Sequence, residues 1–120
     1  MIKWGQDTIK VDEEMEEFDS GALRGKNNLD KGRYDLVPWQ AIHQLAIQCA
    51  KGAKVYGERN AEKGIPISSL IDSGMRHLSQ YMQGKDDEDH LRAALWNISF
   101  AIWMREEKPE MQDIPSRLED

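Results

Sequence analysis

The residues best suited to chemistry stand in a short polar stretch at positions 51–64. It places four cations beside an aromatic ring and an amide, namely Lys51, Lys54, Arg59, Lys63, Tyr56 and Asn60. Gly57 can take the left-handed conformation that ends a helix, and Gly64 breaks the chain again, so the stretch predicts a loop between two helices. Cations, carboxylates and a ring together suit a polyphosphate that carries a base. A solvated connection between helices is polar too, and both interpretations stay open here.

The charge pattern favours a small anion as the ligand of this stretch. The chain has a net charge of −6, but residues 24–63 hold eight basic and four acidic side chains, a net of +4. Residues 1–23 hold two basic and seven acidic side chains, a net of −5. Residues 64–120 hold six basic and eleven acidic side chains, again a net of −5. Binding to a nucleic-acid backbone needs a broad cationic face, which one basic zone does not supply. We therefore expect no nucleic-acid partner.

Length and cysteine count indicate one intracellular domain. A chain of 120 residues can bury a core without staples. Cys49 is the only cysteine, which excludes a disulfide within the chain, and its place in an apolar helical pattern predicts a small core residue in a reducing cytoplasm. No apolar run approaches the roughly 20 residues that span a bilayer, so no membrane partner is expected.

Apolar residues at helical spacing predict an all-α fold, a compact bundle of three main helices. The three helices are expected at residues 38–56, 68–83 and 87–105. Val11, Met15 and Phe18 share one side at helical spacing and predict a short N-terminal helix. Within the single domain 1–120 we expect an acidic segment and long loop at 1–37, a bundle core at 38–105 and a tail at 106–120. The tail is either frayed or docked on a neighbouring subunit.

Details of the second and third expected helices bear on assembly and on the site. Ser69 and Asp72 resemble a capping box, and the acids at 86–89 stand where the helix dipole favours them. The third helix is apolar on nearly every side, so we expect a homo-oligomer. Trp96, Phe100 or Trp103 should lie at its interface. One face of this helix has small residues that leave room for a ligand, beside an amide that is either part of the site or a structural bond between helices: His90, Ala94, Asn97 and Ala101.

Five stretches in chain order carry a family resemblance. They are Lys31–Pro38, Gly52–Asn60, Glu62–Gly64, Arg76–Leu78 and Asp89–Asn97. Together they are similar to the phage-encoded dATP/dGTP diphosphohydrolase family, N-terminal domain type. The resemblance implies cleavage of a purine deoxynucleoside triphosphate to the monophosphate and pyrophosphate, in the host cytoplasm. A more distant likeness to the MazG-like all-α NTP pyrophosphatases implies a metal-dependent bundle that assembles as an oligomer.

The implied reaction needs an aligned water, a divalent cation and positive charge on the leaving pyrophosphate. Candidate ligands of the phosphates are Arg33, Lys51, Lys54 and Arg59. Candidate ligands of Mg²⁺ or Mn²⁺ are Asp35, Glu62, Asp72 and Asp89. The same four carboxylates are candidates for the base, with Asp72 and Asp89 assigned to catalysis. His77 or His90 is expected to orient the water or to ligate the metal ion. Tyr56 and Asn60 are expected to stack on and read the nucleotide base, and Asn97 belongs to the same nucleotide-binding set.

Two other classes of function stay open. The chain has no P-loop glycine pattern and no zinc-type spacing of cysteine or histidine. The Glu-x-x-Glu and Glu-x-x-Asp pairs of MazG-like enzymes are also missing from the second and third helices, where His77, His90 and Asn97 take the inward places. A non-catalytic phage protein that sequesters a host signal or inhibits a host enzyme would keep the cationic loop without a metal cluster. A structural helical adaptor is the third possibility.

Overall fold

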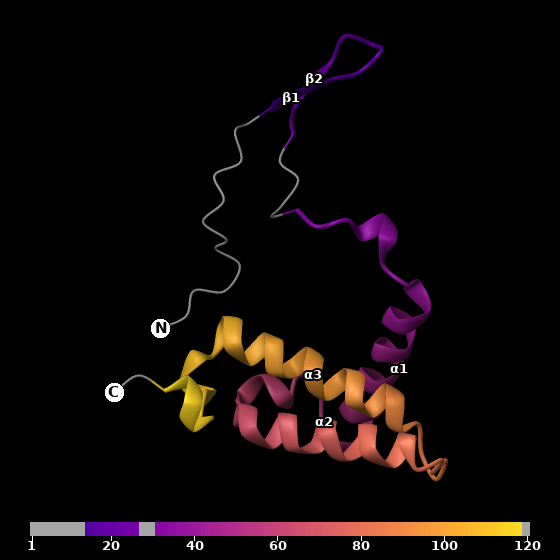
Figure 1. Cartoon of the computed structure of the whole chain (residues 1–120), viewed down its shortest axis with the longest axis vertical. Coiled ribbons are helices and arrows are strands. Elements are labelled where there is room, and N and C mark those ends of the chain that lie inside the picture. The colour runs from indigo at the N-terminus through magenta and orange to yellow at the C-terminus, as the bar shows by residue number, and fades with distance from the viewer. Residues whose placement is uncertain (1–13, 27–30, 119–120) are drawn as a thin grey trace. The chain divides into compact units, whose positions relative to one another are not determined.

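The computed structural model describes residues 14–26 and 31–118 (Figure 1). The chain divides into two compact units, Met1–Val37 and Pro38–Asp120, and each is described by itself. The second unit is built of helices, which confirms the predicted all-α bundle. None of the described helices combines the length and the apolar character that crossing a membrane requires.

The first unit contains a β-hairpin. Strand β1 (Glu14–Glu17) pairs antiparallel with β2 (Leu23–Lys26), and Glu17 lies opposite Leu23. The turn closes through a hydrogen bond from Gly21 N to the Phe18 carbonyl (2.8 Å), and Gly21 has φ +87°, a conformation that glycine tolerates. A short helix η1 (Tyr34–Leu36) follows.

The predicted short N-terminal helix is therefore wrong where it can be compared. Met15 lies in β1, and Phe18 begins the turn, whereas Val11 falls outside the described residues. The turn sequence Asp19-Ser20-Gly21 reverses the chain, so the two flanking segments pair as strands although three apolar residues stand at helical spacing. Met15 and Leu23 stay 59% and 61% exposed, so the hairpin has no core of its own in the described part of the unit.

Helix α1 (Trp39–Tyr56) begins after Pro38 and ends at Gly57, as predicted. It packs on α3, and Arg92 of α3 reaches it with hydrogen bonds to the side-chain oxygens of Gln48 (2.9 Å) and Gln44 (3.3 Å). No residue of α1 is fully buried. Cys49, predicted to be a core residue, is exposed. The correction has a simple cause: a helix that packs mainly on one neighbour leaves part of its apolar stripe uncovered.

Helices α2 (Ile67–Met82) and α3 (His90–Glu107) form the centre of the bundle and lie side by side in Figure 1. Against the predicted 68–83 and 87–105, α2 is shifted by one residue, and α3 starts three residues later and ends two residues later. The core cluster consists of Ile67, Leu70, Ala101 and Met104. Gly74 is buried against α3, where an added Cβ would lie 3.3 Å from Ile98 Cδ1, so the missing side chain permits the close approach of the two helices.

The C-terminal tail packs on its own bundle. After α3 it forms the short helices η3 (Pro109–Met111) and η4 (Pro115–Arg117), and Met111 and Ile114 pack against the core cluster. The tail is therefore not frayed, and its docking on a neighbouring subunit stays a prediction. Asp113 bonds Ser68 in the first turn of α2: its carboxylate accepts from Ser68 N (2.9 Å) and from the hydroxyl (2.5 Å).

The cap of α2 thus differs from the predicted capping box of Ser69 and Asp72. Pro66 is the N-cap residue and supplies no side-chain bond, and Asp72 pairs with Arg76 at 2.8 Å. The carboxylate that satisfies the exposed N–H group at the helix start comes from 45 residues away. Local spacing could not reveal this, because a helix N-terminus accepts any carboxylate that the fold brings to it.

Removing this cap should lower stability in a pH-dependent way. The bonds from the Ser68 hydroxyl and then from its N–H hold the pKa of Asp113 below its ordinary value of 3.8. A lowered folded-state pKa stabilises the native chain above the ordinary value, and this contribution is lost as pH falls through the lowered one. We expect Asp113→Ala to unfold at a lower temperature than the wild type at pH 7, and the difference to shrink below about pH 4. Thermal unfolding followed by circular dichroism across pH 3–7 measures it, and a difference that is constant with pH would contradict the cap.

Candidate functional site

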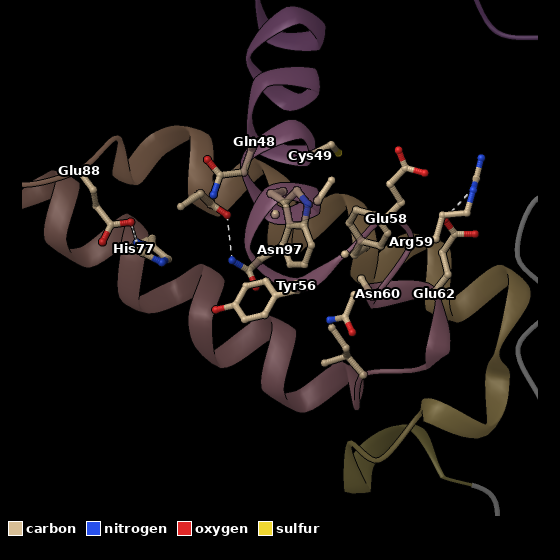
Figure 2. A pocket seen from close by; sticks show the side chains of 18 residues that line it. Gln48, Cys49, Tyr56, Glu58, Arg59, Asn60, Glu62, His77, Glu88 and Asn97 are labelled. Carbon is tan, nitrogen blue, oxygen red and sulfur yellow. Dashed lines mark hydrogen bonds and ion pairs between the residues drawn. The ribbon is translucent and has the colours of Figure 1, made fainter.

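A pocket of about 670 Å³ lies within the helical unit (Figure 2). The C-terminal half of α1, the loop at 57–60, the short helix η2 (Ala61–Lys63), α2 and α3 all contribute to it. On α1 the lining residues recur one helical turn apart at Gln48, Gly52 and Tyr56. Two small residues of this stripe, Gly52 and Ala53, leave room beside the helix. Only the α1 side chains on this stripe line the pocket and can contact a ligand there.

The loop after α1 brings polar side chains to one end of the pocket. Gly57 ends the helix with φ +94°, and Arg59 follows in the left-handed region at φ +59°. Arg59 is the one non-glycine residue with a positive φ in the described part of the chain. This conformation is unfavourable for a residue with a side chain and is concentrated at functional sites. Arg59 Nη1 pairs with Glu62 Oε2 at 2.9 Å, and both residues line the pocket.

Asn97 forms part of the pocket wall from the middle of α3. It is buried, and its side-chain amide donates to the Ala93 carbonyl at 2.8 Å, one turn earlier in the same helix. This bond satisfies the amide nitrogen within α3, so Asn97 does not link two helices through it. Figure 2 shows Asn97 and Tyr56 between the two ends of the pocket, with Arg59 and Glu62 toward one end and His77 and Glu88 toward the other.

At the second end, two histidines meet across the turn between α2 and α3. His77 Nδ1 lies 2.9 Å from His90 Nδ1, and Glu88 Oε1 lies 3.9 Å from His77 Nδ1. His90 is buried, and its Nε2 bonds Asp87 Oδ1 at 2.7 Å. The hydrogen bond from His90 holds the pKa of Asp87 below its ordinary value, so this carboxylate is ionised at neutral pH.

The structure brings together some of the sequence candidates and leaves others apart. Those that line the pocket are Tyr56, Arg59, Asn60, Glu62, His77 and Asn97. Lys51 and Lys54 do not line it, because they fall off the stripe of α1 that faces the pocket. Asp89 caps α3 by accepting from Arg92 N (3.0 Å), and Asp72 pairs with Arg76. Both are also outside the lining.

Arg33 and Asp35 belong to the first unit, where they bond each other. The guanidinium holds two hydrogen bonds to the carboxylate, at 2.8 and 2.7 Å. This pairing lowers the pKa of the Asp35 carboxyl and raises that of Arg33. Their proposed contacts with phosphate and metal stay predictions.

Sequence reasoning missed Glu58 and Glu88, which line the pocket. Glu88 was grouped with the acids expected to begin the third helix at 87, but α3 starts at His90. Glu88 therefore stands in the turn before the helix and lies near His77. Glu58 follows Gly57 directly, and the sharp end of α1 places it at the pocket. The one available signal was its position in the chemically rich stretch 51–64.

The charge of the lining sets what the pocket can bind. Three carboxylates, Glu58, Glu62 and Glu88, stand against one permanent cation, Arg59. Such a lining repels a free polyphosphate, because like charges close together in a partly enclosed site destabilise one another. It attracts divalent cations, for which carboxylate oxygens are good ligands. An anionic ligand thus fits this pocket when it arrives with a metal ion.

Comparison with known proteins identifies one family. The model of the family described as dATP/dGTP diphosphohydrolase, N-terminal, matches residues 22–114, which is most of the chain. The matched range includes all the residues that line the pocket. Comparisons with curated proteins and with solved structures returned no match.

Proposed function

We propose that this chain, which belongs to the dATP/dGTP diphosphohydrolase N-terminal family, hydrolyses dATP or dGTP to the monophosphate and pyrophosphate with the help of a divalent cation. The observation that carries the proposal is the pocket within the matched range, since it joins a cation, carboxylates and an aromatic side chain in one cavity. Its volume of about 670 Å³ lies within the 300–1,000 Å³ typical of small-molecule sites.

The end of the pocket at Arg59 suits the phosphates. Arg59 offers a planar group of donors that matches phosphate oxygens. Glu58 and Glu62 stand at the same end (Figure 2) and are suited to a hard cation, Mg²⁺ or Mn²⁺, that accompanies the triphosphate. The cation would neutralise phosphate charge and polarise the reacting phosphorus. Tyr56 and Asn60 also line the pocket and would contact the base beyond the phosphates.

Two points of the proposal concern assembly and the rival function. We propose a homo-oligomer, supported by apolar side chains of α1 that are exposed in the single chain, among them Trp39 (60%) and Val55 (71%).

A nucleotide-sequestering protein would use the same pocket without turnover. Measuring pyrophosphate release, rather than binding alone, separates that protein from an enzyme.

The decisive experiment follows pyrophosphate release from a panel of nucleotides with Mg²⁺, with Mn²⁺ and with a chelator. We expect turnover of dATP or dGTP with at least one metal, and none with the chelator, because the acidic lining cannot hold the triphosphate alone. Glu62→Gln removes one metal-binding charge at nearly constant shape and should lower turnover at least about tenfold, because an electrostatic contact that helps to hold the metal ion is lost. Glu110→Gln removes an exposed carboxylate that does not line the pocket and is the matched control.

Three results would count against the enzyme. Tight nucleotide binding without pyrophosphate release under either metal would favour the sequestering protein. If the chain neither binds nucleotide nor releases pyrophosphate, both functions are excluded and a structural adaptor remains. Equal activity of Glu62→Gln and the wild type would mean that the metal ion does not bind at the Arg59 end of the pocket.

A further inference from the structure

The end of the pocket opposite Arg59 holds three potential metal ligands that the proposed hydrolysis does not use. His77 comes from α2, His90 begins α3, and Glu88 stands in the turn between the helices. One ligand atom from each lies within 4.8 Å of the other two. No second group of three such side chains occurs within residues 14–26 and 31–118. Two imidazoles and a carboxylate are a common ligand set for transition metals.

The separation of the imidazoles fits coordination to one ion. His77 Nδ1 and His90 Nδ1 are 2.9 Å apart. Two nitrogens that each lie about 2.05 Å from an ion are about 2.9 Å apart at a right angle and about 3.3 Å apart at the tetrahedral angle. Glu88 Oε1 is 3.9 Å from His77 Nδ1, and its side chain is 54% exposed, so rotation about its own bonds can close the remaining gap.

The surroundings of His90 prepare its Nδ1 for a metal. His90 Nε2 lies 2.7 Å from Asp87 Oδ1, and a carboxylate oxygen at this distance accepts a hydrogen bond from the ring N–H, so the proton of the neutral ring is on Nε2. In the neutral ring this leaves the lone pair of Nδ1 pointing at His77. A carboxylate behind a ligating imidazole, in contact with the opposite nitrogen, is the arrangement that orients histidines in metal sites. With its side chain 1% exposed, His90 is also held rigidly by packing.

From this geometry we propose that His77 Nδ1, His90 Nδ1 and a carboxylate oxygen of Glu88 bind a divalent transition-metal ion. His77 then carries its own proton on Nε2, and the ion takes the place of the proton that the two rings share. Imidazole ligands favour ions such as Zn²⁺, Co²⁺ or Ni²⁺ over Mg²⁺, which prefers oxygen. Because His77 and Glu88 line the pocket, the ion is accessible to a ligand there. The inference concerns an ion bound in the absence of nucleotide and does not depend on the proposed hydrolysis.

The test is titration of the full-length, tag-free chain, first stripped with a chelator, with Co²⁺ followed by visible absorption and with Zn²⁺ followed by calorimetry. We expect one ion per chain, with no competition from excess Mg²⁺. His77→Gln should weaken binding at least about tenfold. Asp87→Asn should weaken it about 10- to 100-fold, the range seen when the partner of a ligating histidine is replaced. Glu88→Gln should change the Co²⁺ spectrum because one charged ligand is lost.

His43→Gln is the matched control, because His43 is an exposed histidine of α1 outside the cluster. It should bind the ion as the wild type does. Helical circular dichroism shows that each variant is folded, and His77→Gln and Glu88→Gln change side chains that are not fully buried. Absence of binding in the folded wild type would overturn the proposal. Binding that persists in His77→Gln, or that disappears in His43→Gln, would overturn it equally.

Discussion

Replacing Arg59 by glycine is expected to weaken binding of dATP and dGTP at least about tenfold while leaving the fold intact. Hydrogen bonds to charged groups contribute about 1.5–3 kcal/mol each, and 1.4 kcal/mol is a factor of ten in affinity. Stability should change by less than about 1 kcal/mol, because the glycine relieves the positive φ of Arg59 and the lost ion pair with Glu62 is a surface pair. Nucleotide titration with Mg²⁺ and chemical unfolding measure the two quantities separately.

The control for this prediction removes a cation from the adjoining short helix η2 without touching the pocket. Lys63 is exposed and does not line the cavity, so Lys63→Ala changes the local charge as Arg59→Gly does. We expect its nucleotide affinity to stay within about threefold of the wild type, since a side chain outside the pocket lining acts on the phosphates only at a distance, where salt screens its charge. Equal losses in the two variants would mean that general positive charge, and not Arg59 at the pocket, holds the phosphates.

Truncating Met104 to alanine is expected to lower the free energy of unfolding by about 2–5 kcal/mol. Met104 is 0% exposed and belongs to the cluster of Ile67, Leu70 and Ala101 that joins α2 to α3. The loss combines the transfer of buried atoms with the cavity that they leave behind. Domains of this size are stable by about 5–15 kcal/mol, so the change removes a large share of the total. Urea unfolding followed by circular dichroism measures it.

Met82 provides the matched control for Met104. The same substitution, Met82→Ala, changes a side chain that is 84% exposed at the end of α2. Its effect should stay within about 0.5 kcal/mol, as is usual for surface positions. If both variants lose stability to the same extent, the core does not centre on the contact between α2 and α3 at Met104.

The three long helices were determined by the sequence alone, because apolar residues at a period of 3.6 specify a helix before any neighbour is known. Pro38 and Gly57 also marked the bounds of α1 to within a residue. The start of α3 was misplaced, since a run of acids before a helix extends its apparent first turn. The five motifs in chain order likewise identified the family, which the match over residues 22–114 confirms.

Which side chains meet was decided by tertiary structure. Lys51, Lys54 and Arg59 are all cations of the same stretch, so the sequence alone could not rank them as ligands. Of the three, only Arg59 lines the pocket, because α1 turns one face toward α3 and its last turn leads the following loop to the pocket. Asp113 reaches Ser68 across 45 positions of sequence.

His77 and His90 are 13 residues apart and meet only because α2 and α3 pack side by side. Periodicity records which face of a helix is apolar. It does not record which neighbour covers that face, and the neighbour decides where polar groups from distant segments converge.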